Sequence, residues 1–271
     1  MDNKLQNLTY NHILFKNPIS NTEKFTLHSH NNYELLFFKK GEADYVIEER
    51  KYKLKKNDLV FIRSGKYHYI EIKSDSDYER VNISFDASVV GSKLLHMIDE
   101  GIEVVNCPKE SVIGEIFARL EYYDSNLSEQ NFFALLPSLL IETFYALTIS
   151  YDDGINIPSE ISPILTKAIK YINDNLFSIK SIKEISDQFF VSEQYFFRLF
   201  QTQLKTSPKK YLNSKRLLRA QKMIQRGKKP IEVYLQCGFE TYVGFYKQYL
   251  KTFGYPPSKE RNVSIPNLVR S

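Results

Sequence analysis

The stretch from Ser178 to Arg261 contains one pattern twice, and this repetition constrains the fold more than any other feature of the chain. The pattern is a short amphipathic helix, a tight turn and a second helix rich in aromatic residues. The first copy reads SIKSIKEISDQFFVSEQYFFRLFQTQLKTSP, and the second reads PIEVYLQCGFETYVGFYKQYLKTFGYPPSKER. The segment between them, YLNSKRLLRAQKMIQRGKK, predicts one connecting helix. The sequence therefore predicts two helix-turn-helix units joined by a helix.

In the first unit, an apolar stripe defines the first helix, because Ile182, Ile185 and Phe189 recur at helical spacing. The tripeptide 190–192 forms the turn, and Ser192 is a good N-cap because its hydroxyl can accept from an unpaired amide of the next helix. We expect the buried face of that second helix to consist of Tyr195, Phe196, Leu199 and Phe200.

The exposed side of the same helix has side chains suited to DNA bases. In a helix-turn-helix the second helix enters the major groove and reads bases near its N-terminal end. Glutamine can pair with adenine and arginine with guanine, so Gln194 and Arg198 are the expected base readers. Taken alone, the unit could also be an ordinary helical hairpin with a solvated polar face. The residues expected to contact DNA from this unit are Ser192, Glu193, Gln194, Phe197 and Arg198.

The second unit repeats the arrangement and favours the DNA-binding interpretation of both. Gly238 lies at the matching turn, and Gly254 followed by two prolines is typical of a helix end with a left-handed cap. We expect Phe245, Tyr249 and Leu250 to pack inward. The residues left to face DNA are Glu240, Thr241, Tyr242, Val243, Tyr246 and Lys247.

Charge is divided unevenly along the chain. The overall net charge is +5, but residues 1–160 have a net charge of −8 and residues 161–271 a net charge of +13. A basic C-terminal half beside an acidic N-terminal half is typical of a phosphate-neutralising module attached to a different module. Phosphate contacts are expected from Lys209, Lys210, Arg216 and Arg219.

The N-terminal half predicts short antiparallel strands after a loose start. The expected strands are 33–38, 44–48, 59–62, 68–72 and 78–85, with turn residues such as Gly41 and Gly65 between them. Strands at this spacing indicate a sandwich or a small barrel.

One group of titratable residues stands out among these strands. His28, His30 and Glu34 lie close in sequence, and His68 follows after two predicted strands. Three imidazoles and one carboxylate suit iron, manganese, nickel or zinc. The same residues, with Arg63, could instead line a mouth that binds a small polar effector, since arginine holds carboxylates well. A third interpretation is that these histidines only satisfy hydrogen bonds at strand ends. We expect effector binding without a metal.

Two helices are expected between the strands and the repeated units. The first carries an apolar stripe from Ile113 to Tyr123, and the second begins after Ser128. The second contains Pro137 and Glu142, which favour a buried helix over a membrane span. Its wide apolar face fits either pairing between two chains or packing against its own domain. Residues 151–160 are expected to form a linker, and Pro163 to Phe177 the first helix of the DNA module.

The C-terminal residues resemble the AraC/XylS family of bacterial transcription regulators over about a hundred residues. The landmarks of the resemblance are Ser192, Tyr195, Arg198–Phe200, Tyr211–Leu212, Arg216–Leu217, Ala220, Gly238–Phe239, Phe245, Phe253–Gly254, Pro257 and Arg261. The chain departs from the family pattern where the family usually has a small residue, an isoleucine, a phenylalanine–lysine pair and a glycine. The residues at these positions are Tyr234, Pro230, Tyr249–Leu250 and Lys205.

The N-terminal motifs are similar to the two signature motifs of the cupin barrel, which AraC-type regulators use as a sensor. The resemblance implies a two-domain α+β protein: a cupin-like antiparallel β-barrel with accessory helices, then an all-α domain with two helix-turn-helix units. The expected domains are 1–150 for effector binding and dimerisation, and 161–263 for DNA binding. Activation is the more usual mode of regulation in the family.

The expected function is a sequence-specific, non-enzymatic transcription regulator without a cofactor. Its expected partners are double-stranded DNA, a small-molecule effector, RNA polymerase and a second copy of the chain, but no membrane. Two distant cysteines and a polar N-terminus without a signal-peptide layout indicate the cytoplasm. The alternative is a metal-dependent cupin enzyme or a metal sensor fused to a DNA-binding module.

Overall fold

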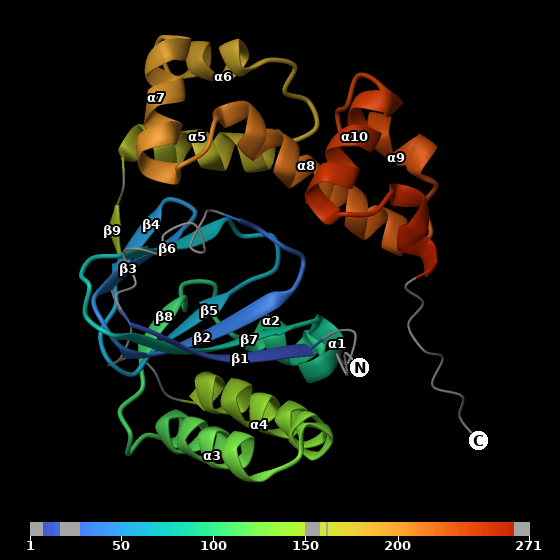
Figure 1. Cartoon of the computed structure of the whole chain (residues 1–271). Coiled ribbons are helices and arrows are strands. Elements are labelled where there is room, and N and C mark those ends of the chain that lie inside the picture. The colour runs from blue at the N-terminus through green and yellow to red at the C-terminus, as the bar shows by residue number, and fades with distance from the viewer. Residues whose placement is uncertain (1–7, 17–27, 150–157, 161, 263–271) are drawn as a thin grey trace. The chain divides into compact units, whose positions relative to one another are not determined.

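The computed structural model describes residues 8–16, 28–149, 158–160 and 162–262 (Figure 1). The chain divides into two compact units, Met1–Glu160 and Ile161–Ser271. Of the linker expected at 151–160, residues 151–157 lie outside the described residues, and residues 158–160 lie within them.

The N-terminal unit is built from two antiparallel sheets. The five-stranded sheet has the order β1(Leu8–Phe15), β7(Tyr78–Phe85), β2(Tyr33–Lys40), β5(Asp58–Ile62) and β8(Val104–Asn106). The four-stranded sheet has the order β6(His68–Ile72), β3(Ala43–Ile47), β4(Arg50–Lys53) and β9(Ser159–Glu160). All neighbouring strands within each sheet run antiparallel.

All five predicted strands are present, but the expectation of a loose N-terminal start is wrong for residues 8–15. Strand β1 pairs with β7 along its whole length, from Leu8 opposite Phe85 to Phe15 opposite Tyr78. The sequence of β1, LTYNHILF, does not alternate regularly between apolar and polar residues, so the hydrogen bonds of a distant partner strand determine its conformation. Strands β4, β8 and β9 were not predicted, and they have four, three and two residues.

Side chains of the five-stranded sheet alternate between two cores. On β2, Leu35 and Phe37 belong to a core shared with helices, whereas Leu36 and Phe38 belong to a core shared with the second sheet. Since successive side chains point to opposite faces, Glu34 lies on the same face as Leu36, in the interior between the sheets.

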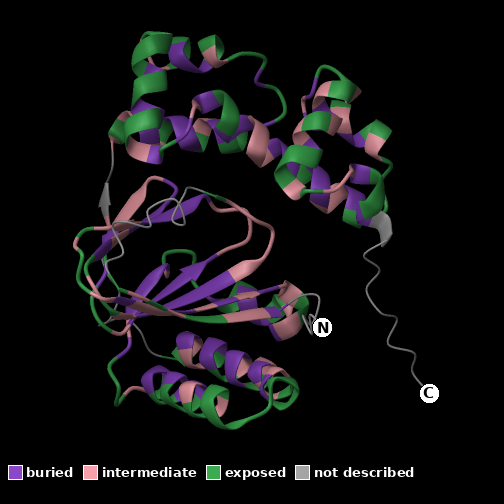
Figure 2. Cartoon of the chain, in the orientation of Figure 1, coloured by how far each residue is buried: buried purple, intermediate pink, exposed green. Residues whose placement is uncertain are grey.

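The outer face of the five-stranded sheet is covered by helices α1(Ala87–Val90), α2(Ser92–Met97), α3(Val112–Asn126) and α4(Glu129–Ile149). Phe117 of α3 stacks on Phe37 at 4.3 Å, and Phe144 of α4 meets Phe61 edge-on at 5.1 Å. Buried residues line the sheet-facing sides of α3 and α4 (Figure 2).

Helix α4 is long and apolar enough, by length and composition alone, to cross a membrane. Seven of its residues are buried, among them Phe132, Leu136 and Leu140 in the core that α4 shares with α3 and the sheet. The wide apolar face seen in the sequence therefore packs within its own domain. Because these residues are already buried within one chain, the wide apolar face of α4 does not by itself indicate pairing between two chains.

The C-terminal unit is helical and contains both predicted helix-turn-helix units. Its elements are α5(Pro163–Asp174), α6(Ile182–Gln188), α7(Glu193–Leu204), α8(Pro208–Gln225), α9(Pro230–Gln236), α10(Tyr242–Phe253) and the 3-10 helix η2(Pro257–Asn262). Helix α8 is the predicted connecting helix. Side-chain oxygens cap the N-termini of α6, α7, α8 and α10, and the capping residues are Ser181, Ser192, Ser207 and Thr241.

Two residues expected to be buried in this unit are not. Tyr195 is 37% exposed, because the buried stripe of α7 runs through Phe196 and Phe200 and leaves the preceding position about 100° away. Leu250 is 40% exposed for the same reason, since it follows the buried Tyr249 by one position on α10.

Candidate functional site

The exposed N-terminal end of α7 carries the residues predicted for the first unit. Ser192 accepts a hydrogen bond from the amide of Tyr195, which starts the helix. Gln194 and Arg198 are exposed and lie four residues apart, so they share one side of the helix. The Arg198 guanidinium lies 5.5 Å above the ring of Tyr195. We call the exposed residues Ser192, Glu193, Gln194, Phe197 and Arg198 the α7 surface.

The corresponding end of α10 is only partly available. Glu240, Thr241, Val243 and Lys247 are exposed, whereas Tyr242 and Tyr246 are half-buried. We call these six residues the α10 surface. The Tyr242 ring lies 5.6 Å from that of Tyr234, in an edge-on pair. Tyr234 replaces the small residue usual in the resembled family, and this ring pair accommodates its bulk between α9 and α10.

Arg216 does not contact phosphate, which corrects the sequence-based prediction. It is only 6% exposed, and its guanidinium donates to the carbonyl oxygens of Leu176 at 2.9 Å, Ile179 at 2.6 Å and Gly238 at 2.9 Å. Burial lowers the pKa of Arg216, and the three carbonyl acceptors compensate for the lost water. The other predicted phosphate contacts, Lys209, Lys210 and Arg219, are exposed on α8.

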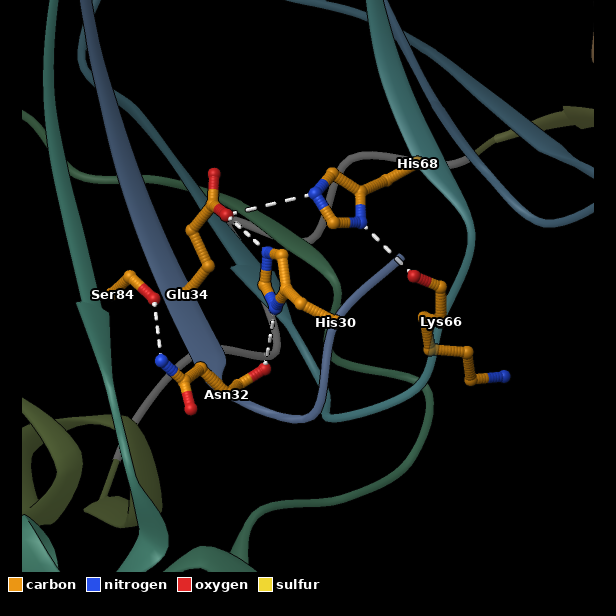
Figure 3. A network of polar contacts seen from close by, with 6 residues as sticks. All are labelled: His30, Asn32, Glu34, Lys66, His68 and Ser84. Atoms are coloured by element: carbon orange, nitrogen blue, oxygen red, sulfur yellow. Dashed lines mark hydrogen bonds and ion pairs between the residues drawn. The ribbon is translucent and has the colours of Figure 1, made fainter. Parts of the chain in front are cut away.

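In the N-terminal unit, three residues close in sequence converge with one from a later strand, and their burial increases from the exposed His28 to the buried Glu34 and His68. His28, His30, Glu34 and His68 each offer one donor atom, and these atoms all lie within 4.8 Å of one another. We call this group the histidine cluster. The backbones of His28 and His68 exchange two hydrogen bonds, each amide donating to the other residue's carbonyl oxygen. Glu34 is the second residue of β2, and His68 is the first residue of β6. Figure 3 shows the rings of His30 and His68 directed toward the Glu34 carboxylate.

Hydrogen bonds orient the imidazole rings of the histidine cluster. The Nδ1 atom of His30 bonds the carbonyl oxygen of Asn32, and that of His68 bonds the carbonyl oxygen of Lys66, both at 3.0 Å (Figure 3). Since a carbonyl can only accept, both Nδ1 atoms carry the proton. The Nε2 atoms of His30 and His68 lie 2.9 and 3.6 Å from Glu34 Oε2, and the hydrogen bond of His30 to this carboxylate places a second proton on its ring.

The electrostatics of the cluster are dominated by Glu34. Its burial would raise the pKa of the carboxyl, but the contacts with His30 and, at longer range, His68 lower that pKa well below its ordinary value. Burial would lower the pKa of His30, and its hydrogen bond and attraction to Glu34 raise it instead. The cluster thus holds a charged carboxylate in the interior of the protein.

A small cavity of about 60 Å³ adjoins the cluster. Its lining residues are His28, Glu34, Tyr45, Tyr69, Ile70, Arg80 and Asn82. Arg80 and Asn82 were not predicted as site residues. The alternation along β7 could have identified them, because both share the inward face of Tyr78. With its amide nitrogen turned toward Glu34, Asn82 donates to Oε1 at 2.8 Å.

Arg63 does not join the histidine cluster, which corrects its prediction as an effector-binding residue. Its guanidinium donates to the backbone carbonyl oxygens of Ile98 at 3.3 Å, Asp99 at 2.6 Å and Ile102 at 3.0 Å, and lies 4.8 Å above the ring of Phe61. Arg63 follows β5 on the face of Phe61, which points to the helices, so alternation directs it away from the interior.

Comparison with known proteins relates both units to one family. Residues 18–100 match the AraC-like ligand binding domain, and residues 185–262 match a helix-turn-helix domain, so together the two matches cover more than half of the chain.

Three curated relatives are transcription regulators. The raffinose operon transcriptional regulatory protein RafR of Pediococcus pentosaceus is 25% identical over 77% of this chain and 76% of its own. The virulence regulon transcriptional activator VirF of Yersinia enterocolitica is 22% identical over 90% of this chain and 94% of its own. The regulator ArgR of Pseudomonas aeruginosa is 33% identical over 37% of this chain and 31% of its own. With an antiparallel ligand-binding unit followed by a double helix-turn-helix unit, this chain belongs to the AraC family of DNA-binding transcription regulators.

Proposed function

We propose that the α7 surface reads base edges in one major groove and that the α10 surface contacts the next, about one helical turn away. The observation that carries the proposal is the exposed pair Gln194 and Arg198 at the capped N-terminal end of α7. The half-burial of Tyr242 and Tyr246 leaves the second unit fewer free side chains. The first unit therefore contributes most of the sequence discrimination.

Phosphate contacts in this proposal come from Lys209, Lys210 and Arg219, whose side chains are exposed on α8. Lys209 and Lys210 lie in the first turn of α8, directly after the loop that follows α7. These contacts position the protein on the duplex without specifying sequence. Arg216 acts instead as an internal brace between the two helix-turn-helix units.

The ligand-binding function is assigned to the histidine cluster and the cavity beside it. A ligand bound there changes regulation by binding one arrangement of the protein better than another, which shifts the population between the two. The protein acts in this proposal as a cytoplasmic, non-enzymatic activator that recruits RNA polymerase. The relative VirF is itself described as a transcriptional activator, which supports this sign of regulation.

We also propose that the chain forms a homodimer through the hairpin of α3 and α4. The apolar width of α4 is used within its own domain, but Tyr122, Tyr145 and Ile149 remain exposed on the hairpin. Sedimentation of the full chain tests this assignment. A dimer that dissociates in a Tyr145→Glu/Ile149→Glu variant supports it, and a dimer unaffected by both changes contradicts it.

The DNA-binding surfaces are tested by titrating the full chain with duplexes from upstream regions of its source genome at several salt concentrations. We expect affinity to fall steeply with salt, because bound phosphates release counterions. A Gln194→Ala/Arg198→Ala variant should lose discrimination between duplexes and keep the salt dependence. If that variant instead discriminates as well as the unchanged protein, base reading by the α7 surface is wrong.

A further inference from the structure

We propose that the histidine cluster binds one divalent transition-metal ion, and that this ion is the ligand to which the N-terminal unit responds. The first part stands on the geometry of the cluster alone. The second part deepens the ligand-binding function proposed above and rests on it.

The donor set and its spacing fit a transition metal. Three imidazoles and one carboxylate suit zinc, iron, nickel or manganese, whereas calcium and magnesium prefer oxygen ligands throughout. Ligand atoms lie about 2.0–2.2 Å from such an ion, so donors on opposite sides of it are about 4.2 Å apart. The four donor atoms already lie within 4.8 Å of one another. The two most distant donors would have to move about 0.6 Å or more closer together to complete the site.

The groups around the donors are arranged as metal sites require. Metal-binding histidines donate their second ring nitrogen to a carbonyl or carboxylate, which fixes the tautomer and the ring orientation. His30 and His68 do so through Nδ1, to Asn32 and Lys66. Both therefore present Nε2 to the centre of the cluster. Asn82 holds the second oxygen of Glu34 at 2.8 Å, which leaves Oε2 directed toward the histidines.

One donor atom lacks a hydrogen-bond partner. The Nε2 atom of His68 is fully buried and has no hydrogen-bond partner among the described parts of the chain, with Glu34 Oε2 3.6 Å away. A buried polar atom without a partner destabilises the folded protein, because it has lost its hydrogen bonds to water. A metal ion at the centre of the cluster would take up this lone pair and the charge of Glu34 together.

The size of the cavity favours an ion over an organic ligand. Pockets for organic ligands have volumes of about 300–1,000 Å³. The cavity bounded by the described residues has about 60 Å³, which has room for a few waters that would complete the coordination of an ion. Arg80 contributes a cation to the cavity wall, so the space suits one metal ion with water, hydroxide or a small anion as its remaining ligand.

The test uses the full-length chain, freed of metal with a chelator and titrated with Co²⁺ and separately with Zn²⁺. We expect one equivalent of either ion to bind, with visible ligand-field bands for Co²⁺. His30→Ala and Glu34→Gln should weaken binding about 100-fold or more, since loss of an outer-shell partner alone weakens it about 10–100-fold. His96→Asn is the matched control, because His96 is exposed on α2 and outside the cluster, and it should bind normally.

A second variant keeps the test decisive if ligand substitutions prevent folding. Asn82→Ala retains all four donors and should weaken metal binding about 10–100-fold. Absence of Co²⁺ bands in the folded unchanged protein, or equal binding by the unchanged protein and folded His30→Ala, would overturn the metal site.

DNA binding by the same samples separates the two parts of the proposal. A change in DNA affinity on adding Zn²⁺, lost in the Asn82→Ala variant at the same ion concentration, supports the metal as the regulatory ligand. One bound metal with unchanged DNA affinity would keep the metal site and overturn its regulatory role. No bound metal, together with an organic compound that alters DNA affinity, would overturn the metal site and leave the ligand-responsive function standing.

Discussion

The Nη1 atom of Arg216 donates a 2.9 Å hydrogen bond to the carbonyl oxygen of Gly238, which joins the connecting helix α8 to the turn of the second helix-turn-helix unit. The Nε and Nη2 atoms of the same guanidinium donate to Leu176 and Ile179, in the segment between α5 and α6. One buried side chain therefore links both helix-turn-helix units to the connecting helix α8. We expect the relative placement of α7 and α10, the helices proposed to contact DNA, to depend on it.

Arg216→Ala should destabilise the C-terminal unit by about 3 kcal/mol or more, because hydrogen bonds to charged groups contribute about 1.5–3 kcal/mol and three carbonyl groups would lose their donor. Urea unfolding measures this change. Arg219→Ala is the control on the same helix: it is exposed, so its stability should change by less than about 0.5 kcal/mol. DNA binding by the Arg219 variant should instead show a salt slope reduced by about one. A stable Arg216→Ala protein with only a reduced salt slope would restore the phosphate role.

Gly238→Ala should destabilise the protein more than Gly227→Ala. Both glycines have left-handed backbones, with φ of +77° and +91°, which cost an alanine about 1–2 kcal/mol. A Cβ at Gly238 would lie 2.8 Å from Cζ of Arg216, whereas one at Gly227 would have no described atom within 4 Å. The additional loss of stability at Gly238 should be about 1–3 kcal/mol, by analogy with overpacked cores. This difference measures the clash between the new Cβ and the Arg216 guanidinium. Equal losses in chemical denaturation would show that Arg216 yields without cost.

Lys205→Gly should stabilise the protein by about 0.5–1 kcal/mol. Lys205 ends α7 in the left-handed conformation, at φ +54°, and its amide bonds the carbonyl oxygen of Phe200. Glycine is the usual residue at such a cap because it lacks the clashing Cβ. Lys205→Ala retains the Cβ and serves as the control, with little change expected. A melting temperature that rises equally in both variants would mean that the lysine side chain, rather than the backbone, is responsible.

Alkaline pH should destabilise the C-terminal unit through Tyr249 and Tyr255. Tyr249 donates a 2.6 Å hydrogen bond to the buried Glu260. Burial and then Glu260 raise the pKa of Tyr255 to about 12, and they raise the pKa of Tyr249 further. Since these folded-state values exceed the ordinary pKa of 10.0, the stabilisation is complete below pH 10 and is lost as pH rises through the folded-state values.

Tyr249→Phe isolates the contribution of that hydroxyl. The variant should lose about 1.5–3 kcal/mol at pH 7, the range for a hydrogen bond to a charged group, and lose less further stability above pH 10. Tyr145→Phe, an exposed tyrosine of the other unit, is the control and should behave as the unchanged protein. Unfolding curves at pH 7, 10 and 11 provide the comparison. An identical alkaline loss in Tyr249→Phe would assign the effect to other groups.

Single substitutions on the α7 surface should change sequence preference. Gln194→Ala and Arg198→Ala are each expected to cost about 1–3 kcal/mol at one base-pair position and to relax preference there. Lys209→Ala should weaken binding to all duplexes alike, because the contact proposed for Lys209 is with phosphate, which carries no sequence information. Competition against single-base variants of one duplex distinguishes these results. If Arg198→Ala weakened every duplex equally, Arg198 would be a phosphate contact as well.

The local patterns were sufficient to predict the two helix-turn-helix units, the N-cap at Ser192, the left-handed cap at Gly254 and five strands. These features depend on hydrophobic spacing and on a few residues of strong conformational preference, so neighbouring residues determine them. The convergence of His28, His30, Glu34 and His68 was also expected, although through resemblance to a known motif rather than from spacing.

Only the tertiary structure decided the roles of residues whose chemistry suits two environments. Arg63 and Arg216 were each predicted to meet a ligand or phosphate, yet both guanidiniums bind backbone carbonyl groups that come from distant segments. Strand β1 and the cavity residues Arg80 and Asn82 likewise depend on pairing partners far away in sequence. Sequence by itself determined which segments form helices and strands, because that preference is local. The orientation and burial of long polar side chains were decided by packing, because the groups that satisfy them come together only in the folded chain.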